Sequence, residues 1–155
     1  MEKTISITAE IRSICSQLLE KYKDAIGETG HTASGNLART ATYRCEFDGR
    51  YFDLIFNLES YWKYLEYGTK PHFPPISDIE KWITVKRLVP SSNKGKPPTT
   101  KQLAFSIARG ISIKGTKPTG LLQTTINRNK NLVDALCDAI LDQIEKQIDE
   151  ELETL

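Results

Sequence analysis

The chain contains two histidines, His31 and His72, which are the first residues to consider as catalysts. A histidine acts as a general base or a nucleophile only when a carboxylate or another reactive group lies close to it. Glu66 is the last acidic residue before His72 in the sequence, and this pair would suit a hydrolase. However, Pro71 and Phe73 flank His72, which favours a structural or interface role for its ring. We therefore expect no catalytic residue and no enzymatic activity.

The remaining polar motifs are too incomplete to predict a cofactor or a metal site. Gly95-Lys96 and Gly115-Thr116-Lys117 carry fragments of a phosphate-binding loop, without the strand that precedes such a loop. The acidic residues of 145–153 fall on the outer face of a helix with an apolar stripe, so we expect them to be solvated. The three cysteines form no C-x-x-C pair and are expected to be buried, reduced thiols: Cys15, Cys45 and Cys137.

The 21 basic and 20 acidic side chains nearly balance, but they are segregated along the chain. Residues 1–80 carry 9 basic and 12 acidic side chains, residues 81–133 carry 11 basic and no acidic ones, and residues 134–155 carry 1 basic and 8 acidic ones. The net charges of these blocks are therefore −3, +11 and −7. The basic block predicts contact with phosphate or with an acidic protein surface, such as the C-terminal helix of the same or a neighbouring copy.

The segment from Tyr61 to Pro75 is the richest in aromatic residues and prolines. Four aromatics within seven residues precede a Gly-Thr bend and a His-Phe pair between prolines, which predicts packing or docking. We expect the aromatic side chains in the core or at a subunit contact, and a backbone conformation at the glycine that a β-carbon would penalise. The residues of this structural or interface motif are Tyr61, Tyr64, Tyr67, Gly68, Thr69, His72 and Phe73.

Two long helices are predicted near the ends of the chain. The first runs from Thr8, its N-cap, to Ile26, and Gly27 should end it. The second runs from about residue 131 to 152. Each has one apolar stripe at three- and four-residue spacing. The stripe residues are Ile11, Ile14, Cys15, Leu18, Leu19, Tyr22 and Ile26 in the first helix, and Leu132, Val133, Leu136, Cys137, Ile140, Leu141, Ile144 and Ile148 in the last.

A β-hairpin is predicted between these helices. Residues 41–47 and 51–58 alternate apolar and polar side chains, and Asp48-Gly49 is a typical two-residue turn. Before it, Ser34 or Asn36 should cap a short turn that Leu37 anchors to the core.

Residues 61–67 fit either a strand or a helical turn, and we favour the turn. A capping box at 77–80 predicts a helix that turns Trp82 and Ile83 to the core. Thr99 or Thr100 should cap another helix, which extends to about Ile111 and is weakened near Gly110.

Two basic loops connect these elements, near residues 90–98 and 114–120. They are rich in glycine and proline and have no apolar anchor, so we expect them to be exposed and mobile. Their candidate contact residues are Lys94, Lys96, Lys114 and Lys117.

These elements predict a single α+β domain over residues 1–155. Its antiparallel sheet is built on the central hairpin, and the long N- and C-terminal helices pack on that sheet. No stretch reaches the roughly 20 apolar residues of a membrane span. The N-terminus has no apolar segment typical of a signal peptide, so we expect synthesis in a cytoplasm.

The block Tyr64-Leu65-Glu66-Tyr67-Gly68-Thr69 resembles a signature of the HK97 gp10-like family of tailed-bacteriophage and prophage proteins. Ser34-Gly35-Asn36-Leu37 and the order of the predicted elements are also similar to that family, although Leu121-Leu122 lack the phenylalanine expected there. The resemblance implies a non-enzymatic head–tail connector (neck) or tail-completion subunit in the virion. It implies a homo-oligomeric ring around the DNA passage, in contact with neighbouring connector or tail proteins.

Two other functions remain open at this point. The basic region 86–117 would suit a small nucleic-acid-associated protein, although no helix-turn-helix pattern is present and the aromatics precede the basic region. A hydrolase that uses His72 is the weaker alternative.

Overall fold

The computed structural model describes residues 7–30, 35–91 and 95–154 of the chain. Within these residues, seven helices and one antiparallel hairpin form the mixed helix-and-sheet fold that the sequence predicts. The elements are α1 (Ala9–Glu28), α2 (Asn36–Thr40), β1 (Thr42–Phe47), β2 (Phe52–Asn57), α3 (Trp62–Tyr67), α4 (Ile76–Val85), α5 (Thr100–Lys114), α6 (Leu121–Arg128) and α7 (Lys130–Glu153).

Helix α1 is the centre of the main core, as its stripe predicts. All seven predicted stripe residues are buried. Thr8 caps the helix, since its side chain accepts a hydrogen bond from Ile11 N at 3.3 Å. The predicted end at Gly27 is wrong, because the helix continues through this glycine to Glu28. Thr29 then follows as the C-cap, and its hydroxyl donates to Ile26 O at 2.8 Å.

The hairpin lies against α1 through one face. β1 pairs with β2 in the register Tyr43↔Phe56 and Cys45↔Leu54, and these four side chains pack on the core of α1 and α7. The turn is centred one residue later than predicted. Asp48 is the first residue of the turn and stabilises it with two hydrogen bonds to Tyr51. Its backbone N–H donates to Tyr51 O at 3.2 Å, and its carboxylate accepts from Tyr51 N at 2.7 Å.

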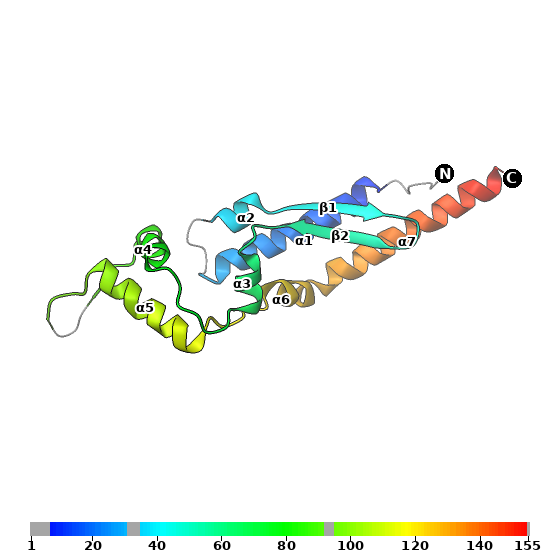
Figure 1. The fold of residues 1–155 in the computed structure, drawn as a ribbon. Helices are drawn as coiled ribbons and strands as arrows, with labels where there is room; N and C mark the ends of the chain where they lie inside the picture. The colour runs from blue at the N-terminus through cyan, green and yellow to red at the C-terminus, as the bar shows by residue number, and fades with distance from the viewer. Residues whose placement is uncertain (1–6, 31–34, 92–94, 155) are drawn as a thin grey trace.

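Only part of α7 reaches this core. Leu136 and Ala139 are buried against α1, whereas Leu141 and Ile148 are more than half exposed. Cys137 is also exposed, so the prediction that it is buried is wrong, while Cys15 is fully buried as expected. Cys137 is exposed because it lies on another face of the helix than its buried neighbours Leu136 and Ala139. Further along, the C-terminal part of α7 extends past the tip of the hairpin and leaves the body (Figure 1).

Helices α4 and α5 pack on each other and form a separate unit, here called the arm. Its small core consists of Ile79, Ile83, Ala104 and Ala108. Figure 1 shows the arm at one end of an elongated molecule and the C-terminus at the other end. The remaining elements are here called the body.

Several predictions for the arm need correction. Helix α4 begins at Ile76 with Pro75 as its N-cap and no capping side chain, so the predicted capping box at 77–80 does not form. Trp82 is 39% exposed and is not a core residue, unlike Ile83. Thr99 does cap α5, in a capping box with Gln102, and α5 continues past Gly110 to Lys114.

Candidate functional site

The joint between the body and the arm is built from a tetrapeptide that occurs twice. The chain leaves the body through Gly68-Thr69-Lys70-Pro71 and returns through Gly115-Thr116-Lys117-Pro118. The two copies lie side by side as an isolated antiparallel bridge between Thr69 and Thr116. The joint is therefore a pair of identical segments related by an approximate twofold arrangement, here called the Gly-Thr clamp.

Hydrogen bonds between the two threonines hold the clamp together. Thr69 N donates to Thr116 O at 3.1 Å, and Thr116 N donates to Thr69 O at 3.2 Å. Thr116 N also donates to the hydroxyl of Thr69 at 3.1 Å, and the two hydroxyl oxygens lie 2.9 Å apart. Each threonine thus uses both its backbone and its side chain to hold the other segment.

The two glycines allow this close approach. Gly68 has φ +69° and Gly115 has φ +67°, a region that disfavours a β-carbon. A β-carbon on Gly68 would lie 2.2 Å from Thr116 O, and one on Gly115 would lie 2.0 Å from Thr69 O. The predicted backbone requirement at Gly68 is confirmed, and Gly115 has the same requirement for the same reason.

Glu66 connects the clamp to the body. It is only 6% exposed, and its carboxylate accepts from Leu122 N at 2.9 Å and from Gln123 N at 3.4 Å. These donors belong to the first turn of α6, whose N-cap Gly120 has no side chain to satisfy them. Negative charge is also favourable at a helix N-terminus. Glu66 therefore acts as a remote cap for α6.

Backbone contacts extend this connection from α3 to the segment before α6. Leu65 O accepts from Thr119 N at 3.0 Å and from the Thr119 hydroxyl at 2.7 Å. Glu66 O accepts from Gly120 N at 3.1 Å. The residues after the second Gly-Thr-Lys-Pro copy are thus fixed to the end of α3.

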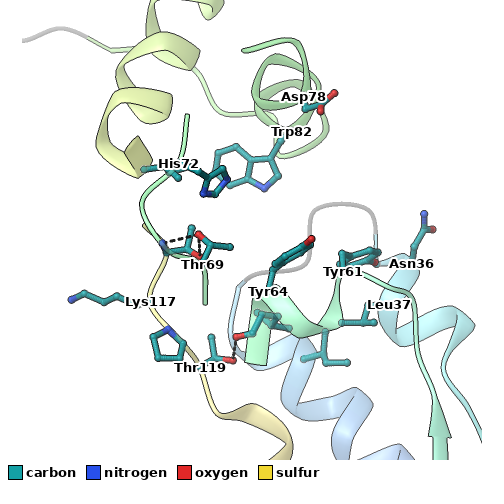
Figure 2. Close-up of a pocket in the computed structure, with 16 residues that line it drawn as sticks. Asn36, Leu37, Tyr61, Tyr64, Thr69, His72, Asp78, Trp82, Lys117 and Thr119 are labelled. Carbon is teal, nitrogen blue, oxygen red and sulfur yellow. Dashed lines mark hydrogen bonds between the residues drawn. The ribbon is translucent and has the colours of Figure 1, made fainter. Parts of the chain in front are cut away.

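A groove of about 1030 Å³ lies between the arm and the body, beside the clamp. Figure 2 shows Tyr61, Tyr64 and Leu37 on its body side and His72 and Trp82 on its arm side. Thr69 and Lys117 lie between the two sides, at the joint. A further link between arm and body is made by Lys86, whose ammonium group donates to Gly30 O.

The exposed aromatics of the predicted motif are not core residues. Tyr64, Tyr67 and Phe73 are between 53% and 70% exposed, so the expectation of a core position is wrong for this subunit, and a subunit contact stays a prediction. Phe73 contacts Phe105 of the arm, with ring centroids 6.0 Å apart. Short helices expose such side chains because one turn can bury only one face, and here α3 buries Glu66.

His72 and Glu66 are not brought together. Both oxygens of Glu66 accept from α6, while His72 Nδ1 lies 2.9 Å from Lys70 O, to which it donates because a carbonyl oxygen only accepts. Among the described residues, no group of three or more His, Cys, Asp or Glu side chains is placed to hold a metal ion.

The basic residues of the two loops have different surroundings. Lys96, Lys114 and Lys117 are exposed, and Lys117 lines the groove. The predicted loop start at Lys114 is wrong, because Lys114 is the last residue of α5. Lys94, His31 and Ser34 lie outside the described residues.

Gly35, and not Asn36, occupies the N-cap of α2, while Leu37 is buried as expected. The described part of the chain contains no helix that is both long enough and apolar enough to cross a membrane.

Sequence reasoning missed three parts of this site. It treated Thr116 as part of an incomplete phosphate-binding motif, it considered Glu66 only as a partner for His72, and it did not predict α6. Comparing the chain with itself would have found the Gly-Thr-Lys-Pro repeat. No comparable signal exists for the Glu66 cap, because its donors lie more than fifty residues further along the chain.

Comparison with protein-family models, with curated proteins and with solved structures found no match for this chain. The resemblance of the Glu66-Tyr67-Gly68-Thr69 block to the phage family therefore stays a prediction.

Proposed function

We propose that this chain is a non-enzymatic structural subunit of a tailed bacteriophage or prophage. It joins head to tail, or completes the tail, as one member of a ring around the DNA passage. It is made in the host cytoplasm and ends in the virion, where its neighbours are other connector or tail proteins.

The observation that carries this proposal is the arrangement of the subunit's two ends. The arm and the end of α7 lie at opposite ends of an elongated molecule. Most of the arm belongs to the basic block of the sequence, and the end of α7 belongs to the acidic block. A ring of identical subunits needs two different, complementary surfaces on each subunit, and this arrangement supplies them.

The use of the motif residues also supports a mechanical role. Gly68 and Thr69 hold together the two segments at the base of the arm through backbone contacts, and Glu66 fixes α3 to α6 as a helix cap. These contacts occupy the groups that a catalytic site would need free for substrate. The motif thus serves to fix the arm's orientation.

The test is negative-stain imaging of the purified protein together with light scattering. The expected result is closed rings whose mass is a multiple of 17.5 kDa. A compact monomer at every concentration would contradict the proposal.

The exposed basic side chains of region 86–117 favour one second candidate, a small nucleic-acid-associated protein. Lys96, Lys101, Arg109 and Lys114 are exposed, and no acidic residue stands between 81 and 133 to neutralise them. Phosphate binding needs only such charges, and its affinity falls steeply as salt rises.

Replacing Lys94, Lys96, Lys114 and Lys117 with serine separates the two candidates. If the partner is protein, assembly should weaken in the absence of DNA, since exposed opposite charges no longer attract. Unchanged assembly with reduced DNA retention would favour the nucleic-acid function.

A further inference from the structure

The projecting part of α7 has an exposed apolar stripe. Leu141, Ile148 and Leu152 are each more than half exposed. Spacings of seven and four residues place them on one face of the helix. Because Leu136 and Ala139 face α1, this stripe is separate from the surface that α7 buries in the body. An exposed apolar stripe on a projecting element indicates a contact site.

An acidic stripe runs beside the apolar one. Glu145 stands four residues after Leu141 and three before Ile148, so it is a surface neighbour of both. Further exposed acids continue the stripe in both directions at the same spacing. The α7 ridge is here defined as the apolar residues Leu141, Ile148 and Leu152 with the flanking acids Asp138, Asp142, Glu145 and Asp149.

The groove at the joint matches the ridge in chemistry. Tyr64, Trp82 and Ile111 give it apolar walls, and among the described residues its lining contains one basic residue, Lys117, and one acidic residue, Asp78. The Lys117 side chain extends away from the aromatic walls (Figure 2). Residues 76–114 of the arm carry 8 basic and 2 acidic side chains, a net charge of +6. The positive charge that would attract the acidic stripe therefore belongs to the arm as a whole and not to the lining of the groove.

The volume of the groove is also suitable for a helix. A diameter of about 11 Å and a pitch of 5.4 Å give roughly 500 Å³ for one helical turn. The groove of about 1030 Å³ is larger than one helical turn, so part of a helix has room in it. Leu141 and Ile148 are separated by about two turns on α7.

The ridge does not reach the groove of its own chain, because α7 runs away from the joint along the hairpin and past its tip (Figure 1), whereas the groove is lined by residues at the joint. A ridge that occupies this groove would therefore come from a second copy. We propose that the α7 ridge of one copy binds in the joint groove of the next. Such a contact between different surfaces repeats from copy to copy, and it either closes a ring or grows a filament. Only the closed ring rests on the proposed function; the contact itself does not.

Two variants test each surface separately. Leu141→Ser with Ile148→Ser removes the apolar part of the ridge, and Tyr64→Glu places a negative charge in the groove. Tyr51→Glu is the matched control, since Tyr51 and Tyr64 are both 63% exposed but Tyr51 lies on the hairpin turn. All replaced residues are exposed, so the thermal midpoints of the variants should stay near that of the parent.

Self-association is measured by light scattering over a concentration series. We expect the ridge and groove variants to have a Kd about 10- to 100-fold higher than the parent, the range for losing central interface contacts. Tyr51→Glu should assemble like the parent. Ridge and groove variants that assemble as the parent does would overturn the proposal.

Mixing the two variants gives the sharper result. The ridge variant retains an intact groove, and the groove variant retains an intact ridge, so a 1:1 mixture should form heterodimers that do not grow further. A mixture that behaves like the separate variants would contradict a contact between these two surfaces.

The same measurements separate this contact from the proposed function. Open filaments that both variants abolish would support the contact and contradict the ring. Closed rings that neither variant affects would support the ring and contradict the contact. A parent that stays monomeric contradicts both. If such a monomer binds duplex DNA and Tyr64→Glu weakens that binding, the groove is a nucleic-acid binding site and not a contact between copies.

Discussion

Gly68 and Gly115 lie in equivalent positions on the two sides of the Gly-Thr clamp. Gly68 lies against the carbonyl oxygen of Thr116, and Gly115 lies against that of Thr69. A β-carbon on either glycine would come within 2.2 Å of that oxygen. The joint between the arm and the body therefore depends on two residues that lack side chains. They are 47 positions apart in the sequence, as are Thr69 and Thr116.

Replacing either glycine with alanine should open the clamp. We expect Gly68→Ala and Gly115→Ala to lower the free energy of unfolding by about 2 kcal/mol or more, from positive-φ strain and steric overlap. Denaturant unfolding measures the loss, and limited proteolysis should show faster cleavage next to the arm. Gly27→Ala is the control, because Gly27 lies inside α1 with open space around its α-carbon, and it should be neutral or stabilising by up to about 1 kcal/mol. Equal effects at all three glycines would contradict this explanation.

The two clamp threonines should be energetically coupled. Thr69→Val and Thr116→Val keep the side-chain shape but remove the hydroxyl groups, and each should cost about 0.5–1.5 kcal/mol. Because the hydroxyls contact each other, the double variant should cost less than the sum of the single ones. A double-mutant cycle of unfolding free energies tests this. Strict additivity would show that the hydroxyl contact contributes nothing.

Glu66→Ala should destabilise α6 specifically. It leaves the backbone N–H groups of Leu122 and Gln123 without their acceptor in a half-buried position, which costs about 1–3 kcal/mol. Hydrogen exchange should increase in the first turn of α6. Glu46→Ala is the control, because the Glu46 side chain forms an exposed ion pair with Arg44, of the kind that contributes about 0–1 kcal/mol. Unchanged protection of α6 in Glu66→Ala would count against the capping role.

Stability should fall in alkaline solution for a specific reason. Burial, with the nearby thiol of Cys45, raises the pKa of Cys15 from 9.0 to about 12, and burial, with the charge of Glu66, raises the pKa of Tyr22 from 10.0 to about 12. The folded state therefore keeps protons that the unfolded state releases above pH 9 to 10. The stabilisation is complete below pH 9 and is lost as the pH rises through about 12.

Urea unfolding at pH 8 and at pH 10.5 measures this loss. Tyr22→Phe removes one of the two groups, so its stability should fall less between these pH values than that of the parent. If both proteins lose the same amount, Tyr22 does not contribute to the alkaline transition.

Local patterns in the sequence were sufficient for most of the body. The stripe of α1, the alternation of the hairpin and the helical turn at 62–67 are each encoded within a short window, because burial on one face requires its own periodicity. The positive φ of Gly68 could also be predicted, since a Gly-Thr bend between a helix and prolines requires it.

The sequence by itself determined most of the helical and extended segments, α6 excepted, where the charge blocks lie and that Gly68 must have no side chain. Only the tertiary structure decided that Glu66 caps α6, that Gly115 repeats the role of Gly68 and that Trp82 faces a groove rather than a core. It also decided that α7 leaves the body before its stripe ends. The physical reason is that periodicity reports which face of an element is apolar, whereas the partner of that face depends on contacts between residues far apart in the chain.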